Sequence, residues 1–213
     1  MMKNINTNNI KKLLPVELHS IFIGIMLSEG ALYRSSPTAN TRFEIRIEGK
    51  YKEFALHIGE FFKDYIINPE KSLKIKGLSK VSFYFKFKTR SLNIFNSYYE
   101  MFYRLNPETK KYTKIVPINI IDLMDPIVLA YLIQGNGNFD KSRNRVKIYT
   151  NSYSKVEAEQ LATSIKTKLN IFTAVLLDRK DQYILTIGTN NLELLRNIVT
   201  PHFHPSMLYK IGL

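Results

Sequence analysis

The amino-acid sequence predicts an α+β protein in which one unit occurs twice, each copy running helix, two strands, helix, two strands, helix. Two apolar segments of matching pattern carry this prediction: Phe22–Gly30 and Leu129–Gly137 both end in a small residue, a polar residue and glycine. Each is followed by residues that alternate between apolar and polar, as expected of a half-buried strand. The same order at two places indicates an internal duplication.

The two apolar segments are expected to form helices packed at the centre of the molecule. Pro15 and Pro126 stand where these helices would begin, because proline is tolerated in the first turn. Small side chains would let the helix backbones approach closely, and the residues concerned are Gly24, Ser28, Ala130 and Gly135. Glu29 and Asn136, at the two helix ends, would then lie side by side.

The predicted strands form antiparallel sheets and follow each motif in the same order. Alternating strands are expected at Arg42–Glu48 and Arg145–Thr150, and the clearest alternation of all is at Lys80–Lys88. Two further strands, Phe172–Leu177 and Gln182–Gly188, flank a predicted hairpin loop at 178–181.

Amphipathic helices are predicted at about Tyr51–Tyr65 and Ser154–Leu169. Their apolar faces comprise Phe54, Ile58, Phe61 and Phe62 in the first helix and Val156, Leu161, Ile165 and Leu169 in the second. Ser154, with a glutamate three residues later, has the spacing of a capping box. A final helix closes each copy, at about Ser91–Tyr103 and Asn191–Val199.

The expected domain organisation is a basic arm at residues 1–14, a first repeat at 15–105, a linker at 106–119 and a second repeat at 120–213. The linker contains two prolines and a cluster of lysines. The arm lacks the continuous apolar stretch and cleavage site of a secretory signal, so secretion is not expected. No stretch approaches the roughly 20 apolar residues of a membrane-spanning helix, which argues against a membrane partner.

The charge balance points to a polyanionic partner. Lys and Arg number 31 and Asp and Glu number 18, for a formal charge of +13. An excess of that size attracts polyanions, and nucleic acid is the leading candidate. Cysteine is absent, which excludes disulfides, thiol catalysis and cysteine-based zinc sites. Abundant Asn, Lys and Ile, whose codons are AT-rich, would suit an organellar gene.

Basic and polar side chains occupy the predicted solvent faces of the strands. On any one strand such a face is most simply a solvated surface that discourages edge pairing. The same bias in both copies, together with the net charge, favours DNA, whose phosphates Lys and Arg would contact while other side chains reach base edges. The predicted DNA-binding residues are Arg34, Arg42, Glu44, Arg46, Lys80, Ser82, Tyr84, Lys86, Lys88, Arg143, Arg145, Lys147, Tyr149, Arg179, Lys180 and Gln182.

The two motifs and the elements after them resemble those of single-chain LAGLIDADG homing endonucleases, the type encoded in introns of fungal mitochondria and other organelles. The resemblance extends from about Pro15 to Leu213. It implies a pseudo-twofold αββαββα fold and a saddle of β-strands on double-stranded DNA. It also implies Mg²⁺-dependent cleavage of both strands at a long asymmetric site, by a monomer of mitochondrial origin.

The resemblance also implies a site. Carboxylates at the helix ends would hold divalent cations, which can stabilise the attacking and leaving oxygens of a phosphodiester. The expected cofactor is Mg²⁺, with Ca²⁺ as a non-catalytic substitute. The implied catalytic residues are Glu29, Asn136, Lys114 and Lys210, and the implied metal ligands are Glu29, Asn136, Ser28 and Gly135. A lysine at each matching place would stabilise charge on the phosphate, although an ordinary surface lysine is an equally good interpretation of either one alone.

Asn136 departs from the family pattern, because a second acid is expected there. An amide keeps a carbonyl oxygen but carries no charge, so the site should hold Mg²⁺ less strongly and cleavage should be impaired. Three explanations remain open: an engineered replacement, natural decay of cleavage, or retention of binding in a protein that assists RNA splicing. The alternatives to an endonuclease are therefore a splicing maturase that binds intron RNA and a DNA-binding protein without chemistry.

Overall fold

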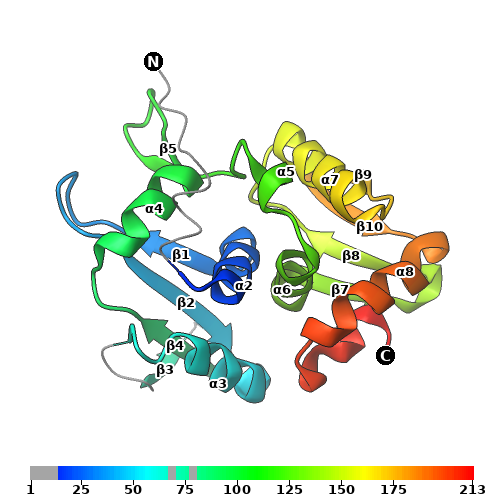
Figure 1. Cartoon of the computed structure of the whole chain (residues 1–213), viewed down its shortest axis with the longest axis horizontal. Helices are drawn as coiled ribbons and strands as arrows, with labels where there is room; N and C mark the ends of the chain where they lie inside the picture. Colours follow the sequence, from blue (N-terminus) through cyan, green and yellow to red (C-terminus); the bar gives the residue numbers. More distant parts are fainter. Residues whose placement is uncertain (1–13, 67–70, 77–80) are drawn as a thin grey trace. The chain divides into compact units, whose positions relative to one another are not determined.

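The structure, a computed structural model, describes residues 14–66, 71–76 and 81–213, with the backbone alone at 71–76 and 81–83. The chain divides into two units, one combining the chain up to Ser28 with Met101–Leu213, the other being Glu29–Glu100. Figure 1 shows the helices and strands of both. Residues 1–13 of the expected arm lie outside the described residues. The limits of the two repeats stay a prediction.

The unit Glu29–Glu100 contains a four-stranded antiparallel sheet with the strand order β1-β2-β4-β3. The strands are β1 (Gly30–Tyr33), β2 (Arg42–Glu48), β3 (Lys71–Lys76) and β4 (Val81–Lys88). In β2, Phe43, Ile45 and Ile47 are buried while Arg46 and Glu48 are exposed, which confirms the predicted alternation.

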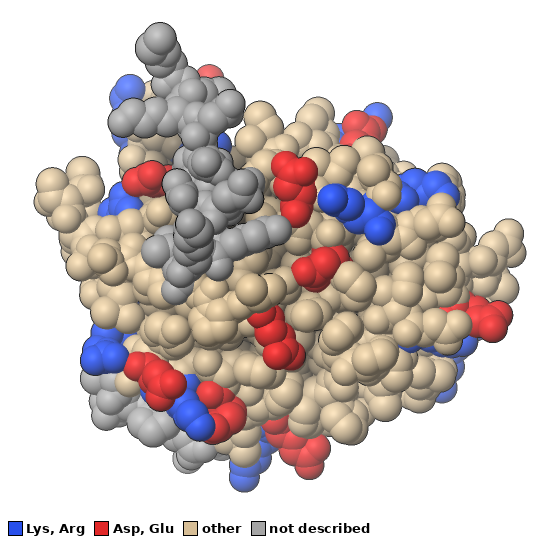
Figure 2. Space-filling model, viewed as in Figure 1, with Lys and Arg blue, Asp and Glu red and all other residues tan. Residues whose placement is uncertain are grey.

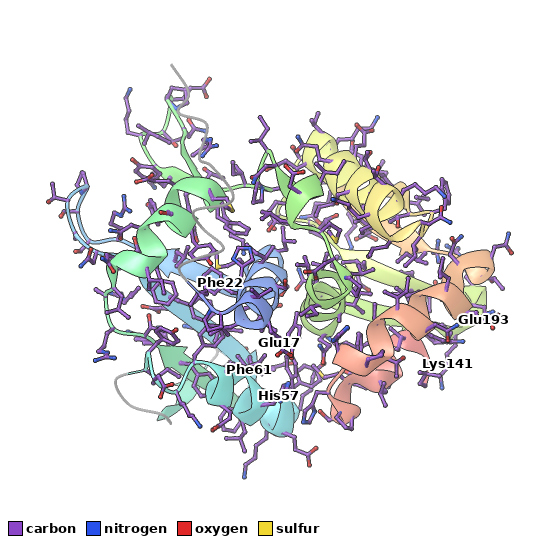
Figure 3. All side chains as sticks on the ribbon, viewed as in Figure 1. Glu17, Phe22, His57, Phe61, Lys141 and Glu193 are labelled. Atoms are coloured by element: carbon purple, nitrogen blue, oxygen red, sulfur yellow. The ribbon has the colours of Figure 1, made fainter. Side chains whose placement is uncertain are left out.

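Helix α3 (Lys52–Phe61) follows β2 after a short 3-10 turn, η1 (Gly49–Tyr51), and packs against β2 and β4. On its apolar face Phe54 and Ile58 are buried and Phe61 is half-buried, and just past its end the Phe62 ring lies 4.9 Å from that of Phe43. His57 and Phe61, labelled in Figure 3, lie one turn apart with ring centroids 4.7 Å apart. The unit continues through η2 (Asn93–Phe95) into α4 (Asn96–Phe102), which runs across the boundary between the units.

The other unit is built on the two motif helices, α2 (Val16–Leu27) and α6 (Pro126–Asn136), which pack side by side. A Cβ added to Gly24 would lie 2.6 Å from the carbonyl oxygen of Val128 and 2.7 Å from Cβ of Tyr131. The close approach expected from the small residues is therefore confirmed at Gly24. Asp125 caps α6 through the backbone N–H of Val128, at 2.8 Å, and accepts a hydrogen bond from Ser20 of α2.

A second four-stranded antiparallel sheet lies in this unit, with the order β7-β8-β10-β9. Its strands are β7 (Gly137–Asp140), β8 (Arg145–Tyr149), β9 (Ala174–Arg179) and β10 (Gln182–Ile187). The registers of the two sheets also correspond: Gly30 faces Ile45 in the first, and Gly137 faces Ile148 in the second. The predicted duplication is thus repeated in strand order and in register.

Two helices cover strands of this second sheet, α7 (Lys155–Leu169) packing against β9 and β10 and α8 (Thr189–Val199) packing against β8. The predicted capping box is present, because Ser154 accepts from the Glu157 N–H and Glu157 accepts from the Ser154 N–H. No helix in the described part of the chain is long and apolar enough to cross a bilayer.

The structure corrects two details of the sequence interpretation. Val156 was expected on the apolar face of α7 but is 65% exposed. The buried residues of this helix are Ala158, Leu161, Ala162 and Ile165. Residues on one helix face are three or four apart, and Val156 is only two residues before Ala158, so it lies on another face. The loop expected at 178–181 is only two residues long, since β9 continues through Arg179 at the sheet edge. Lys180 takes a positive φ of 45° to make the turn.

Several short elements have no counterpart in the sequence interpretation. They are β5 (Tyr103–Leu105), β6 (Tyr112–Lys114), α5 (Ile120–Leu123), η3 (Lys141–Arg143), η4 (Thr200–His202) and η5 (Pro205–Ile211). β5 and β6 form a hairpin in which Tyr103 faces Lys114, so a strand lies inside the segment expected to be a linker. Three residues are too few to establish a period of two.

Candidate functional site

The carboxyl-terminal end of α2 is held by side chains from distant parts of the same unit. The carbonyl of Leu27 accepts a hydrogen bond from the Tyr153 hydroxyl at 3.1 Å, and burial raises the pKa of that hydroxyl. The carbonyl of Ser28 accepts one from Nζ of Lys114 at 3.0 Å. A lysine at this position satisfies a carbonyl that the helix itself leaves unpaired, and its positive charge interacts favourably with the negative end of the helix dipole.

The end of α6 is held in the same way. Lys210 of η5 donates from Nζ to the carbonyls of Gln134, at 2.6 Å, and Gly135, at 2.9 Å. The lysine is only 5% exposed, so the two carbonyls provide much of what water would otherwise give the ammonium. The structure therefore brings each predicted lysine to the end of a motif helix, Lys114 to α2 and Lys210 to α6.

Gln134 is a site residue that the sequence interpretation set aside. It is fully buried, and its side chain donates to the carbonyl of His202 at 3.2 Å and accepts from the N–H of His204 at 2.7 Å. These bonds fasten the segment that carries Lys210 to the motif helix. A polar side chain within a run of apolar residues was the signal available in the sequence, since a buried polar group needs partners.

The side chain of Asn136 acts as a hydrogen-bond donor. Its Nδ2 donates to the carbonyl of Tyr149, at the end of β8, at 3.0 Å. A carboxylate at this position has no proton to donate, so aspartate would replace this bond with repulsion between two oxygens. Glu29 is exposed and is the first residue of the other unit, next to Ser28 in the chain. The expected proximity of Glu29 and Asn136 stays a prediction.

The oxygen atoms at the motif ends are of the kind that Mg²⁺ binds. They comprise the Glu29 carboxylate, the Asn136 amide oxygen and the carbonyls of Ser28 and Gly135. Both carbonyls already accept a hydrogen bond from a lysine ammonium. Within residues 14–66, 71–76 and 81–213 there is no group of three or more His, Asp or Glu arranged to hold a metal. By chemical type these oxygens suit a hard cation, and their arrangement around one ion stays a prediction.

On the first sheet, one carboxylate gathers three of the predicted DNA-binding cations. Glu44 receives Nε of Arg42 at 2.6 Å and Nζ of Lys86 at 2.7 Å, with Nζ of Lys88 at 3.7 Å. Burial opposes ionisation of Glu44, but hydrogen bonds from Lys86 and Arg42 outweigh that effect and lower its pKa. Arg42 also lies over the ring of Tyr33, 4.0 Å from its centroid.

The second sheet has a similar network around Asp140, which was not among the predicted DNA-binding residues. Asp140 receives Nζ of Lys147 at 2.9 Å, the Ser142 hydroxyl at 2.7 Å and Nε of Arg145 at 3.2 Å. Those bonds, with Lys147 the largest contribution, hold the pKa of Asp140 well below its ordinary value. In both sheets the basic side chains are therefore fixed in place by an ionised acid.

The remaining predicted DNA-binding residues differ in how far the protein engages them. Arg34 is held internally, with its guanidinium bonded to Thr41 and to the carbonyl of Asn96. Arg46 is exposed and lies 5.7 Å from the ring centroid of Tyr84. The exposed members on the second sheet and its turns are Arg143, Tyr149, Arg179, Lys180 and Gln182. Lys80 lies outside the described residues, as does the side chain of Ser82.

The space-filling view in Figure 2 shows, on the face turned to the viewer, Lys and Arg in small separate groups, several of them beside Asp or Glu. The ion pairs of the two sheets also place acids and bases at close range. The excess of positive charge is therefore organised through local acid–base pairs as well as through isolated cations.

Comparison with known proteins places the fold and motifs in a family. Residues 19–195 match the model of the LAGLIDADG DNA endonuclease family. The chain belongs to this family.

Two curated relatives illustrate its range. The chain is 25% identical to the cytochrome b mRNA maturase bI2 of Saccharomyces cerevisiae, a match that covers 99% of this chain and 52% of the yeast protein. The chain thus spans about half the length of that relative. It is 23% identical to the DNA endonuclease I-ChuI of Chlamydomonas applanata, over 90% of this chain and 93% of that protein.

Solved structures share the fold. The homing endonuclease I-WcaI, bound to its DNA recognition sequence, matches with a TM-score of 0.81 at 19% identity and covers 99% of this chain and 94% of its own. I-DmoI, solved with DNA and Mn, matches with a TM-score of 0.54 at 14% identity over 86% of this chain and 96% of its own. The predicted α+β fold of the LAGLIDADG type is confirmed.

Proposed function

We propose that this chain is a monomeric, sequence-specific binder of double-stranded DNA that hydrolyses phosphodiester bonds with a divalent metal, and that Asn136 impairs its cleavage. The observation that carries the proposal is a pair of family motif helices within one chain, packed through Gly24, each with a lysine ammonium at its terminal carbonyls. Both halves of a two-strand cutting site are then available without a second subunit.

The proposed roles follow from the chemistry of the side chains. Glu29 supplies the charged ligand and Asn136 a neutral one, with the carbonyls of Ser28 and Gly135 beside them in the chain. A bound Mg²⁺ would stabilise charge on the reacting phosphate oxygens. Lys114 and Lys210 hold the segments that carry Glu29 and Asn136 and place positive charge next to them. The relatives solved with Mn and with Mg support a divalent ion.

The first test concerns binding. Duplexes selected from a random pool should include one long asymmetric sequence, and the logarithm of its affinity should fall steeply and linearly with the logarithm of salt concentration, because phosphate contacts release counterions. Fluorescence anisotropy at several salt concentrations measures the slope. A flat salt dependence, or the absence of any preferred duplex, would contradict the proposal.

The second test concerns cleavage of the selected duplex. With Mg²⁺ the protein should cut both strands slowly or not at all, and Asn136→Asp should cut faster because a second charge strengthens metal binding. Glu29→Gln should abolish residual nicking and keep DNA affinity. Circular dichroism controls for folding, since aspartate at position 136 loses the bond to Tyr149. Equal rates for the unaltered protein and the Asn136→Asp variant would show that the second charge is not limiting.

A second candidate function, RNA splicing, is favoured by one observation. Two of the relatives that match 99% of this chain, from Saccharomyces cerevisiae and Debaryomyces hansenii, are named cytochrome b mRNA maturases. Other relatives are named intron-encoded endonucleases, which supports an origin in an organellar intron and a mitochondrial location. Competition between the selected duplex and structured intron RNA for the protein separates the two functions.

A further inference from the structure

We infer that Arg42 and Arg145 are a matched pair of base-reading arginines, one on each sheet, and that each recognises a guanine through the two terminal nitrogens of its guanidinium. The inference rests on the proposed DNA-binding function. It identifies which of the basic side chains recognise the base sequence, whereas the other basic side chains contribute positive charge.

The two arginines occupy the same place in the two sheets. Arg42 is the first residue of β2 and faces the last residue of β1, while Arg145 is the first residue of β8 and faces the last residue of β7. Each stands three residues before the isoleucine, Ile45 or Ile148, that faces the motif glycine. If each sheet contacts its own half of the target, the two arginines meet corresponding positions of the two halves.

Arg42 is fixed on its Nε edge and on one face. Its Nε donates to Glu44 at 2.6 Å, and the guanidinium carbon lies 4.0 Å from the centroid of the Tyr33 ring. Glu44 is held in turn by Lys86 at 2.7 Å and is 18% exposed. Among the described residues, the terminal nitrogens of Arg42 have no hydrogen-bond acceptor. The edge that remains is the one that can donate two parallel hydrogen bonds.

Arg145 is fixed through the same atom by a different acid. Its Nε donates to Oδ2 of Asp140 at 3.2 Å. Asp140 is 11% exposed and is itself fixed by Lys147 and Ser142. Within the part of the chain that the structure describes, the terminal nitrogens of Arg145 also have no acceptor. In each sheet an acid therefore holds Nε of the arginine and leaves the terminal nitrogens available, although the acid and its neighbours differ between the two sheets.

Two other arginines among the predicted DNA-binding residues, Arg34 and Arg179, do not combine a fixed Nε with available terminal nitrogens. Arg34 uses its terminal nitrogens on the Asn96 carbonyl and on Glu100. Arg179 is 83% exposed, and its carboxylate partner, Asp178, lies 3.8 Å away. A guanidinium that is already ordered loses little side-chain entropy on binding. Its planar fork matches O6 and N7 of guanine, whereas the single ammonium of a lysine does not.

The test compares charge-conserving variants by selection of duplexes from a random pool. Arg42→Lys should lose the preference for guanine at one position in one half of the selected site, and Arg145→Lys at the corresponding position in the other half. Discrimination there should fall about 5- to 150-fold, while the salt slope is retained because the charge is retained. Arg90→Lys is the matched control, since Arg90 donates to the backbone of Asp64 and lies outside the predicted contacts.

Two further variants distinguish positioning from direct contact. Glu44→Gln and Asp140→Asn should weaken the guanine preference at the same two positions and raise affinity for random DNA, because each removes a negative charge from the surface.

The outcomes separate the two proposals. If the unaltered protein selects no sequence, the proposed function fails and this inference fails with it. If it selects a site, and the lysine variants of Arg42 and Arg145 keep every guanine preference, the inference alone is wrong. Loss of guanine at the two corresponding positions, with the Arg90 variant unchanged, supports it.

Discussion

At the scale of single residues, one glycine permits the contact on which the proposed site depends. Any side chain at position 24 would meet backbone and Cβ atoms of α6, which cannot move without displacing the helix. The resulting overpacking should cost Gly24→Ala about 1–3 kcal/mol of unfolding free energy. Urea denaturation followed by circular dichroism measures it.

Gly188→Ala is the control for that substitution. A Cβ at Gly188 meets nothing within 4 Å, and its φ of −82° suits alanine. The change should alter the unfolding free energy by no more than about 0.5 kcal/mol. A small further loss is expected because Gly188 is the N-cap of α8, where alanine is less favourable than glycine. Equal effects of the two alanine substitutions would contradict the close-packing explanation.

At Asn136, the amide nitrogen distinguishes asparagine from the acid expected at this position. The sequence interpretation treated it as an acid that had lost its charge. The structure adds that its amide donates to the carbonyl of Tyr149, a bond that an ionised acid cannot make. The asparagine therefore has a stabilising contact of its own, independent of any metal.

At the scale of elements, the ends of the motif helices are held by lysines. Lys210→Met removes the donor to the carbonyls of Gln134 and Gly135 and should cost about 1–3 kcal/mol of unfolding free energy. Lys114→Met should cost less, because Lys114 is half-buried, so water can replace part of what its hydrogen bond to the Ser28 carbonyl contributes. Thermal and urea denaturation of both variants give the order. A larger loss for Lys114→Met would contradict this account of the helix ends.

Long elements with one buried face were predictable, and short ones were not. The strand at Arg42–Glu48 was predicted with its correct ends because its apolar residues alternate over seven positions. The hairpin of β5 and β6 was missed because its three-residue strands are largely exposed. η5 was missed as well, although it carries Lys210, since no periodic pattern marks it.

At the scale of the whole molecule, the net charge of +13 means that an acid placed among basic side chains reduces their mutual repulsion and stabilises the fold. Asp140 has its pKa lowered by Lys147, Ser142 and Arg145, from an ordinary value of 3.8. Its contribution is fully present above that value and is lost as the pH falls through the lower pKa of the folded state, because the unfolded chain binds the proton first.

The pH dependence of Asp140→Asn follows from that sign. The variant should be less stable than the unaltered protein by a constant amount between about pH 7 and pH 5, and the difference should shrink below about pH 4. Urea denaturation at about pH 7, 5 and 3.5 measures it. Asp178→Asn is the control, since its partner Arg179 is 83% exposed and such a pair contributes little. A difference that grows on acidification would contradict the assignment.

The sequence by itself determined the duplication, the α+β class, the two motif helices and the identity of Glu29, Asn136, Lys114 and Lys210 as candidates. It could do so because burial of one face imposes a period on the residues of an element, and because a repeat places matching residues at matching positions.

Only the tertiary structure decided which atoms those residues meet. It brought Lys210 to the carbonyls of α6 across more than seventy residues and turned Gln134 into an anchor for the C-terminal segment. Neither contact follows a local period. Both depend on hydrogen-bond geometry between segments far apart in the chain, which the pattern of residues does not encode.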